Sequence, residues 1–468
     1  MKIEQIYTTC LAQGAYYIVS ENEAIIIDPL REIQPYLERA KQDNVTVKYI
    51  LETHFHADFV SGHLDLAKAT GATIVFGPNA NPDFEFYAAK DGEELYFGKL
   101  KITVLHTPGH TMESTCYLLF NEENQPRALF SGDTLFIGDV GRPDLAQKAT
   151  NLTQEELAGH LYDSLRQKIM TLPDEVTVYP AHGAGSACGK NMSKETSDTL
   201  GNQKKVNYAL RSDMTKEEFV KEVTEGLLPP PGYFGMNVAM NKNGYESIET
   251  VFERGLNPLS VEAFETLSSS DDILILDTRT ASDFSQGFIP GSLFVGLEGQ
   301  FAPWVGAVIL DVKQKLVLVT PIGKEEETVK RLARVGYDNV LGYLDGSFAS
   351  WLNAGKTIDK IGRITADELV EQKTKNKLVI DVRKPGEFEA EHLEDAVSAP
   401  LDFIYAELLK FPTNQPFILH CAGGYRSIIA GSILKMKGYN DFVDVIGGYN
   451  AISKTSLPRT NFVCQGKG

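Results

Sequence analysis

Six histidine and aspartate side chains of this sequence stand just after short apolar runs, where loops leave predicted strands. They are His54, His56, Asp58, His110, Asp133 and His182. Because loops that leave strand ends gather along one edge of a layered α/β fold, we expect these side chains to converge. Imidazoles and carboxylates are typical metal ligands, and five of the nine histidines lie between residues 54 and 110. This concentration predicts a metal site rather than isolated structural histidines.

A second reactive group is the thiol of Cys421, which begins a C-x4-R loop that ends at Arg426. A short apolar run precedes the loop and a predicted helix follows it. The thiol then faces amide N–H groups and the positive end of the helix dipole, while Gly423 and Gly424 let the backbone curl around the sulfur. The charge of Arg426 would favour the thiolate and hold an anionic sulfur group. We therefore predict a nucleophilic thiol, with Gly423, Gly424 and Tyr425 binding its substrate.

The elements that must position the histidines are short strands and helices. β-Branched or aromatic runs bounded by Gly, Asn and Asp predict strands at residues 16–19, 24–27, 47–51, 73–76, 102–105, 128–130 and 176–179. Periodic stretches between them predict helices at residues 32–42, 62–70 and 154–171. The expected fold of this part is a mixed α/β sandwich with helices covering the sheets.

The rest of the chain repeats itself at an offset of 104 residues. Asp277-Thr-Arg279 aligns with Asp381-Val-Arg383, and each triplet ends an apolar run. A second apolar run and a helical stretch follow in each half. Strands that alternate with helices predict two α/β domains with parallel sheets, each of about a hundred residues. The first copy has no cysteine, because none lies between Cys188 and Cys421.

Length and charge narrow the class of protein further. A chain of 468 residues predicts roughly three domains at about 150 residues each. Hydrophobic residues make up 43% and charged residues 23%, a balance that excludes a disordered or fibrous protein. The 45 Lys and Arg residues against 63 Asp and Glu residues give a net charge of -18. Without a basic run, this charge argues against nucleic-acid partners.

Targeting signals and cysteine usage indicate the expected compartment. No basic segment followed by a long apolar core appears at the N-terminus, and no run of about eighteen apolar residues occurs, so we expect neither secretion nor a membrane partner. The five cysteines are scattered and form no C-x-x-C pair, which favours reduced thiols. We expect a cytoplasmic protein.

The H-x-H-x-D motif with the later His, Asp and His resembles the metallo-β-lactamase superfamily over residues 1 to about 240. The implied fold is an αββα sandwich. Phe59 stands where dinuclear members have a histidine, which compromises a two-metal site, so we expect one metal. The segments Thr53–Phe59, Thr107–His110 and Ser131–Pro143 most resemble persulfide dioxygenases.

The resemblance to persulfide dioxygenases implies that one Fe(II) ion is held by His54, His110 and Asp133. Two imidazoles and a carboxylate are the facial triad of non-haem iron oxygenases, which leaves open positions for a substrate sulfur and O₂. The remaining three residues of the cluster, His56, Asp58 and His182, are then expected to orient the ligands or transfer protons. Arg142 matches the family's substrate-anchoring arginine and is expected to pair with a carboxylate of the substrate.

The C-x4-R loop, with Asp381-Val-Arg383 and Glu387 upstream, resembles the rhodanese domain of sulfurtransferases; the related loop of Cys-based phosphatases is generally one residue longer. The cysteine-less copy then resembles an inactive rhodanese domain. We predict domains at residues 1–245 (dioxygenase-like), 257–357 (cysteine-less rhodanese-like) and 361–462 (catalytic rhodanese). In this domain order, nearly the full chain resembles persulfide dioxygenase–rhodanese fusion proteins.

This resemblance implies an enzyme that oxidises a low-molecular-weight persulfide with O₂ to sulfite and thiol, and that joins sulfane sulfur on Cys421 to sulfite as thiosulfate, in sulfide detoxification. The expected carrier is a glutathione-, CoA- or bacillithiol-type thiol, and we expect a homo-oligomer. One alternative is a thioester hydrolase of the glyoxalase II type, which would use two metal ions. Another is a non-enzymatic sulfur sensor or scaffold.

Overall fold

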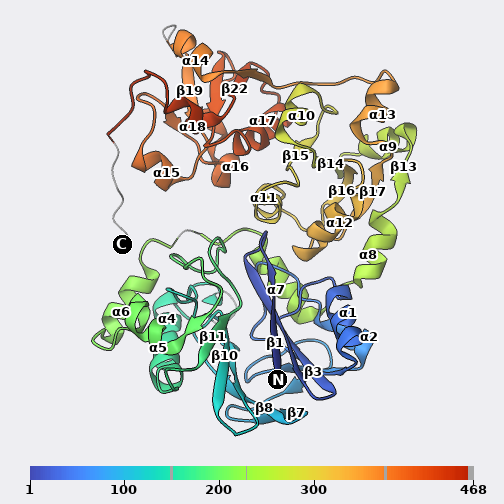
Figure 1. The fold of residues 1–468 in the computed structure, drawn as a ribbon. Coiled ribbons are helices and arrows are strands. Elements are labelled where there is room, and N and C mark those ends of the chain that lie inside the picture. The colour runs from blue at the N-terminus through green and yellow to red at the C-terminus, as the bar shows by residue number, and fades with distance from the viewer. Residues whose placement is uncertain (148–150, 228, 374–376, 462–468) are drawn as a thin grey trace. The chain divides into compact units, whose positions relative to one another are not determined.

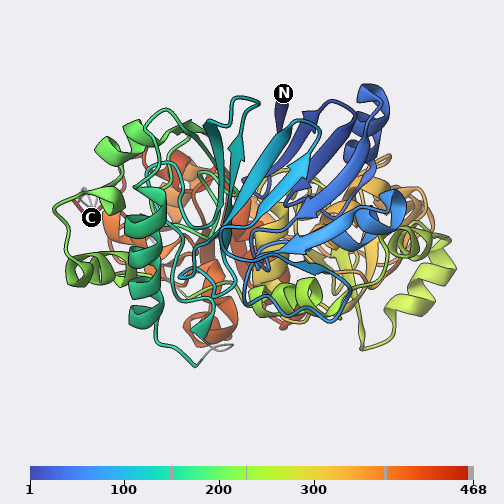
Figure 2. The same ribbon diagram turned by 90° about the horizontal axis from the view of Figure 1, so that it is seen from below.

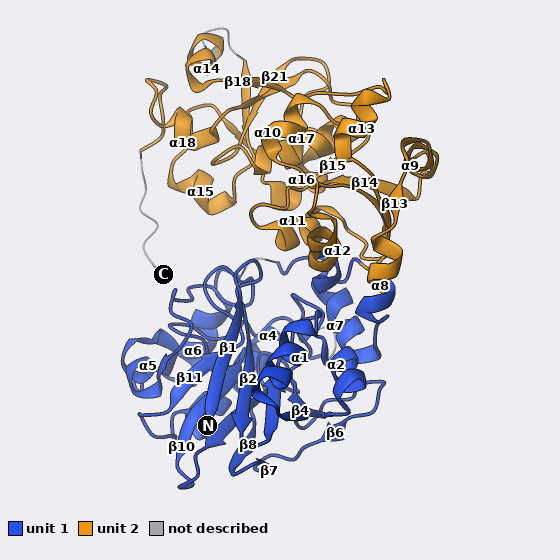
Figure 3. Cartoon of the chain, turned by 45° about the vertical axis from the view of Figure 1, so that its right-hand side comes forward, with its two compact units in different colours: residues 1–250, 332–337 blue, residues 251–331, 338–468 orange. Residues whose placement is uncertain are grey.

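The computed structural model describes residues 1–147, 151–227, 229–373 and 377–461. Residue 462, at the end of the predicted third domain, and Cys464 lie outside the described residues. The chain divides into two compact units (Figure 3): residues 1–250 with 332–337, and residues 251–331 with 338–468. No helix among the described residues is both long and apolar enough to cross a membrane. Cys10, Cys116, Cys188 and Cys421 are free thiols.

The N-terminal unit is built on two six-stranded sheets, with strand orders β1-β2-β3-β4-β5-β6 and β12-β11-β10-β9-β8-β7. The first contains β1 (Lys2–Thr8), β2 (Gln13–Ser20), β3 (Glu23–Ile27), β4 (Thr46–Leu51), β5 (Thr73–Phe76) and β6 (Tyr87–Ala88). The second contains β7 (Glu94–Phe97), β8 (Leu100–His106), β9 (Thr115–Phe120), β10 (Pro126–Gly132), β11 (Thr177–Pro180) and β12 (Asp198–Thr199). Each strand predicted from the sequence lies within or overlaps one of these.

Helices cover the outer face of each sheet (Figures 1 and 2). They are α1 (Gln34–Asp43), α2 (His63–Thr70), α4 (Gln154–Ser164), α5 (Leu200–Val206), α6 (Lys216–Thr224) and α7 (Phe234–Asn243), followed by α8 (Ile248–Gly255). One apolar cluster, with Ile25, Val104 and Phe130, fills the space between the sheets. A second packs α1 and α2 against the first sheet, and a third packs α4 and α6 against the second. The layers are α, β, β and α, which confirms the predicted sandwich.

One predicted helix differs from the structure. The expected helix over residues 154–171 is α-helical only to Ser164 and continues as a π-helical turn over Leu165–Ile169. Both segments bury one apolar face in the same core cluster, through residues such as Leu161 and Ile169. Apolar periodicity therefore marks the buried face correctly but does not distinguish the two hydrogen-bonding patterns.

The C-terminal unit contains two five-stranded sheets with the same topology, β13-β17-β16-β14-β15 and β18-β22-β21-β19-β20, and the described pairs are parallel. The first contains β13 (Pro258–Leu259), β14 (Ile273–Asp277), β15 (Leu293–Phe294), β16 (Lys315–Val319) and β17 (Val340–Leu344). The second contains β18 (Gly362–Ile364), β19 (Leu378–Asp381), β20 (Val397–Ser398), β21 (Phe417–His420) and β22 (Phe442–Val445). The matching strand orders confirm the predicted pair of parallel-sheet α/β domains.

Helices connect the strands of both sheets (Figure 1). They are α9 (Val261–Ser268), α10 (Ala281–Gln286), α11 (Phe301–Val308), α12 (Glu325–Arg334), α13 (Ser347–Asn353), α14 (Ala366–Lys373), α15 (Pro385–Ala390), α16 (Ile404–Glu407), α17 (Arg426–Met436) and α18 (Gly448–Ile452). The repeated triplets make the same contacts in both copies. Arg279 pairs with Asp277 and donates to the Gly287 carbonyl, while Arg383 pairs with Asp381 and donates to the Glu391 carbonyl.

Candidate metal centre and cysteine site

His54, His110 and Asp133 come together in the N-terminal unit. His54 follows β4, His110 follows β8 and Asp133 follows β10, and potential ligand atoms of all three lie within 4.8 Å of one another. The Nε2 atoms of His54 and His110 stand 3.8 and 3.4 Å from Asp133 Oδ2. That carboxylate oxygen is buried and accepts no hydrogen bond from the described residues. One carboxylate oxygen and two imidazole nitrogens are typical metal ligands, and a bound metal ion would give the buried oxygen the partner that it lacks among the described residues.

The other nitrogen of each imidazole is already engaged, so Nε2 is the nitrogen that faces the centre. Nδ1 of His54 contacts the Thr53 hydroxyl at 2.9 Å, and Nδ1 of His110 contacts the Arg142 carbonyl oxygen at 2.8 Å. Burial, together with the nearby His56, holds the pKa of His54 well below its usual range. A neutral imidazole is the form that binds a metal ion, so the surroundings of His54 suit a ligand.

His56, Asp58 and His182 form a second group beside the first, again with potential ligand atoms within 4.8 Å of one another. His182 links the two groups, because Nδ1 lies 2.7 Å from Asp133 Oδ1 and Nε2 lies 2.8 Å from Asp58 Oδ2. Although burial opposes it, the two carboxylates raise the pKa of His182 well above its usual range. The contact with Asp133 is the geometry that the predicted orienting role of His182 requires.

Phe59 lies against this second group. Its ring is fully buried, with its centroid 4.3 Å from that of His56 and 6.3 Å from that of His182. A phenyl ring offers no electron pair to a metal ion, so this part of the wall is apolar. The second group thus offers three polar side chains as possible metal ligands. The apolar ring of Phe59 stands at the position where dinuclear members of the superfamily have a further histidine ligand.

Arg142 is buried at 6% exposure, and its guanidinium is held by the protein itself. Nε and the Nη2 atom each lie 2.7 Å from a carboxylate oxygen of Asp144, and Nη1 donates to the Ala187 carbonyl at 3.2 Å. The predicted substrate carboxylate would have to share this guanidinium with Asp144, so its anchoring role stays a prediction. The backbone carbonyl of Arg142 orients His110, and no motif in the sequence indicates this contact.

Gly141 allows the loops of two proposed ligands to approach closely. A Cβ atom there would stand 2.0 Å from the Asp133 carbonyl oxygen and 3.0 Å from His110 Nδ1. We therefore expect Gly141→Ala to lower the free energy of unfolding by about 1–3 kcal/mol, the usual effect of overpacking, and to reduce bound metal. Denaturant unfolding and metal analysis of the purified protein measure both effects.

Gly235→Ala is the matched control for Gly141→Ala, because a Cβ atom at Gly235 meets no atom within 4 Å. This helical position should keep its metal content and its free energy of unfolding, or gain slightly in stability. Unchanged metal content and stability in Gly141→Ala would contradict the tight approach of the two loops.

The thiol of Cys421 sits at the end of β21, just before α17, and is buried at 1% exposure. The Gly424 amide N–H donates to Sγ at 3.1 Å, and the Ser427 hydroxyl lies 3.5 Å from the same sulfur. Gly424 has a φ of +98°, a backbone conformation that L side chains rarely adopt, and this turns its amide toward the sulfur. The loop therefore directs hydrogen-bond donors toward the sulfur, as the sequence predicts.

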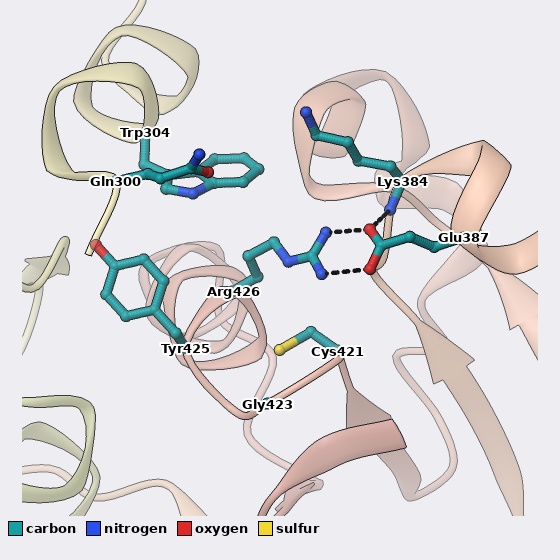
Figure 4. A pocket seen from close by; sticks show the side chains of 8 residues that line it. All are labelled: Gln300, Trp304, Lys384, Glu387, Cys421, Gly423, Tyr425 and Arg426. Carbon is teal, nitrogen blue, oxygen red and sulfur yellow. Dashed lines mark hydrogen bonds and ion pairs between the residues drawn. The ribbon is translucent and has the colours of Figure 1, made fainter. Parts of the chain in front are cut away.

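The sequence predicts that Arg426 acts on the Cys421 sulfur, but in the structure its guanidinium pairs with a carboxylate. Its guanidinium makes a two-pronged ion pair with Glu387, with N–O distances of 2.6 and 2.8 Å (Figure 4). Although burial opposes it, hydrogen bonds and charge from Arg426 hold the pKa of Glu387 below its usual range. Much of the positive charge of Arg426 is thus balanced by the protein. The predicted role of Arg426 toward an anionic sulfur stays a prediction.

Cys421 opens into a pocket of about 320 Å³, shown in Figure 4. The lining residues are Gln300, Trp304, Lys384, Glu387, Cys421, Gly423, Tyr425 and Arg426. Gly423 and Tyr425 were predicted to bind substrate; the Tyr425 hydroxyl donates to the Gly296 carbonyl at 2.8 Å. Sequence reasoning missed Gln300, Trp304 and Lys384, because no motif marks them and two of them belong to the other copy of the repeat.

The corresponding loop of the first copy lacks the thiol. Asp277 pairs with Val319 in the first sheet, and Asp381 pairs with His420 in the second, so Thr320 occupies the place of Cys421. The loop N–H of Gly323 donates to the Glu325 carboxylate at 3.0 Å, whereas its counterpart in the second copy donates to sulfur. A hydroxyl cannot carry sulfane sulfur, so this loop is unsuited to the chemistry that the sequence predicts for Cys421.

The folds and sites define a protein that joins a metal-binding αββα sandwich to a cysteine-bearing parallel-sheet module. Residues 8–182 match the family model of the metallo-beta-lactamase superfamily, and residues 260–354 and 365–455 match that of the rhodanese-like domain. The chain is therefore a fusion of a metallo-β-lactamase superfamily domain with two rhodanese-like domains.

Two kinds of enzyme are among the proteins similar to the N-terminal domain. Hydroxyacylglutathione hydrolase of Francisella philomiragia is 36% identical over 169 residues, which cover 36% of this chain and 61% of that protein. Human persulfide dioxygenase ETHE1, mitochondrial, is 29% identical over 221 residues, covering 47% of this chain and 78% of that protein. The chain thus spans about three fifths of the length of the hydrolase relative.

Similarity to a solved structure extends over most of the chain. The metallo-beta-lactamase from Staphylococcus aureus subsp. aureus COL is 28% identical, with a TM-score of 0.65. The match covers 74% of this chain and 98% of that one. The similarity therefore extends beyond the N-terminal sandwich.

Proposed function

We propose that the N-terminal domain is an iron-dependent dioxygenase that oxidises a low-molecular-weight persulfide with O₂. The observation that carries this proposal is the grouping of His54, His110 and Asp133, two imidazoles and one carboxylate, beside the apolar ring of Phe59. Fe(II) bound by such a triad supplies redox chemistry and open positions for a substrate sulfur and O₂. One persulfide, one O₂ and one water would give one thiol, one sulfite and two protons, with the outer sulfur oxidised and O₂ reduced.

The residues around the triad would fix its ligands and exclude water. Thr53 and the Arg142 carbonyl set the rotation of the two imidazoles, and His182 holds the second oxygen of Asp133. His54, His110 and Asp133 are each at most 2% exposed, so little water reaches them. The His182–Asp58 pair, with His182 Nε2 lying 2.8 Å from Asp58 Oδ2 and its ring beside Asp133, is placed to hold a proton during turnover.

Cys421 is proposed to act as the sulfur carrier of a thiosulfate sulfurtransferase. Its thiolate would accept a sulfane sulfur as Cys–S–S⁻, and sulfite would attack that outer sulfur, forming the S–S bond of thiosulfate and releasing the thiolate. The amide of Gly424 and the hydroxyl of Ser427 are the donors that would stabilise the sulfur anion. Joining both domains in one chain would raise the local concentration of sulfite at Cys421. The role that we propose for the two activities together is sulfide detoxification. We propose a cytoplasmic location on the basis of the free cysteines.

A thioester hydrolase of the glyoxalase II type is the second candidate. Two observations favour it: His56, Asp58 and His182 form a further group of potential ligands, and hydroxyacylglutathione hydrolases are among the relatives. This activity would need a second metal ion beside the first, in spite of Phe59.

Metal counting on protein purified without oxygen separates the two candidates. We expect about one iron per chain and O₂ uptake that depends on added glutathione persulfide. Two zinc ions per chain, with hydrolysis of a glutathione thioester and no O₂ uptake, would instead support the hydrolase. Full iron loading with neither activity would overturn both and favour a sensor or scaffold.

A further inference from the structure

The pocket at Cys421 takes one of its walls from the copy of the repeat that has no cysteine. Gln300 and Trp304 belong to the first copy, at the start of α11, whereas Lys384 and Glu387 belong to the second. Figure 4 shows Gln300 and Trp304 on one side of Arg426, Lys384 and Glu387 on the other, and Cys421 below them. All of these residues lie in the C-terminal compact unit.

The wall from the first copy is fixed in place by contacts near the pocket. The Tyr425 hydroxyl donates to the Gly296 carbonyl at 2.8 Å, and the Ser432 hydroxyl accepts from the Phe294 amide at 3.0 Å. The Tyr405 hydroxyl donates to the carbonyl of Val308, the last residue of α11, at 2.7 Å. Because hydrogen bonds anchor both β15 and the end of α11, Trp304 is a built part of the pocket.

The chemistry of the walls differs from what an inorganic anion alone requires. The charge of Arg426 is balanced by Glu387, whereas no described residue pairs with the exposed ammonium of Lys384. Trp304, only 5% exposed, presents an apolar aromatic surface opposite. The volume of about 320 Å³ lies within the range of small-molecule pockets, about 300–1,000 Å³, so thiosulfate would fill only part of it.

We propose that this pocket selects an organic low-molecular-weight persulfide bearing a carboxylate, with the carboxylate at Lys384 and the carbon skeleton against Trp304. The cysteine-less domain is then a specificity-determining part of the active site of its neighbour. This inference rests on the proposed role of Cys421 as sulfur carrier.

The transfer is balanced without an external oxidant. The Cys421 thiolate attacks the outer sulfur of R–S–SH, a new S–S bond forms on Cys421, and the S–S bond of the donor breaks. The released thiolate R–S⁻ takes up the proton of the persulfide, so that R–SH leaves and Cys421 retains Cys–S–S⁻. The sulfane sulfur keeps its oxidation state throughout.

The test compares sulfur donors in the full-length protein. For glutathione persulfide and thiosulfate, with cyanide as the common acceptor, the ratio of kcat/KM values should fall about 3–10-fold in Trp304→Ala, because an aromatic contact is lost only for the organic donor. For glutathione persulfide and cysteamine persulfide, which lacks a carboxylate, the ratio should fall about 2–5-fold in Lys384→Met. Lys437→Met, an exposed lysine outside the pocket, is the matched control.

Further variants guard against loss of folding. Because Trp304 is buried, Trp304→Phe, which keeps most of the packing, and Gln300→Ala, at an exposed position of the same wall, accompany Trp304→Ala, and thermal unfolding is measured for all. Donor ratios within twofold of wild type in every folded variant would overturn the inference, as would equal losses for organic and inorganic donors. Failure of the carrier role itself is separate: Cys421→Ser would then still transfer sulfur from both donors.

Discussion

Replacing Cys421 with serine should abolish sulfur transfer while leaving O₂ consumption by the N-terminal domain intact. Serine keeps the shape of the loop and its hydrogen-bond donors from Gly424 and Ser427, but its hydroxyl cannot form a persulfide. Removing the nucleophile of a covalent mechanism typically costs more than about 10³-fold in kcat. We expect a loss of at least that size in thiosulfate:cyanide sulfurtransferase assays.

Cys10→Ser is the matched control for Cys421→Ser, because Cys10 is a partly exposed free thiol remote in sequence from the loop. It should retain both activities. If Cys421→Ser keeps its sulfurtransferase activity, the assigned nucleophile is wrong. If Cys421→Ser loses O₂ uptake as well, O₂ consumption by the N-terminal domain depends on Cys421, and the two sites do not act independently.

Replacing His110 with alanine should remove both the metal and the O₂-dependent activity. The change deletes one of three grouped donors and leaves the Arg142 carbonyl and Asp133 Oδ2 facing a cavity. Changes to residues that merely orient metal ligands cost about 10–100-fold in affinity or activity, so the loss of a direct donor should exceed about 100-fold. Metal analysis and O₂ uptake with glutathione persulfide measure the two losses.

His160→Ala provides the control for His110→Ala, since His160 is exposed on α4 and belongs to neither group of potential ligands. Its metal content should equal that of the wild type. The sulfurtransferase activity of Cys421 should survive in His110→Ala, because the thiol loop belongs to the other compact unit. A His110→Ala protein that still binds one iron per chain and consumes O₂ would refute the triad.

Several features of the fold were predictable from local sequence, and others were not. The strands that carry the candidate ligands contain short apolar runs and are predicted from the sequence. β1 (Lys2–Thr8) was not predicted, because it is an edge strand whose residues are mostly half-buried and show no clear alternation. β9 (Thr115–Phe120) was also missed; it is buried at all but its last position and so lacks the alternation of a half-exposed strand.

By itself, the sequence marked the candidate residues for the chemistry that we propose. The positions of His54, His110 and Asp133 after strands and the glycines around Cys421 are local patterns, and the repeat at an offset of 104 residues appears when the chain is compared with itself. Each of these patterns can be read from the order of the residues along the chain, without knowledge of which segments pack together.

Only the tertiary structure decided how those residues are partnered. It placed the Arg142 carbonyl on His110, paired Arg426 with Glu387, and brought Trp304 from the cysteine-less copy to the pocket of Cys421. Each of these contacts joins residues from different loops or different copies of the repeat. Their distance in space depends on how strands pair and helices pack, and no spacing along the chain encodes it.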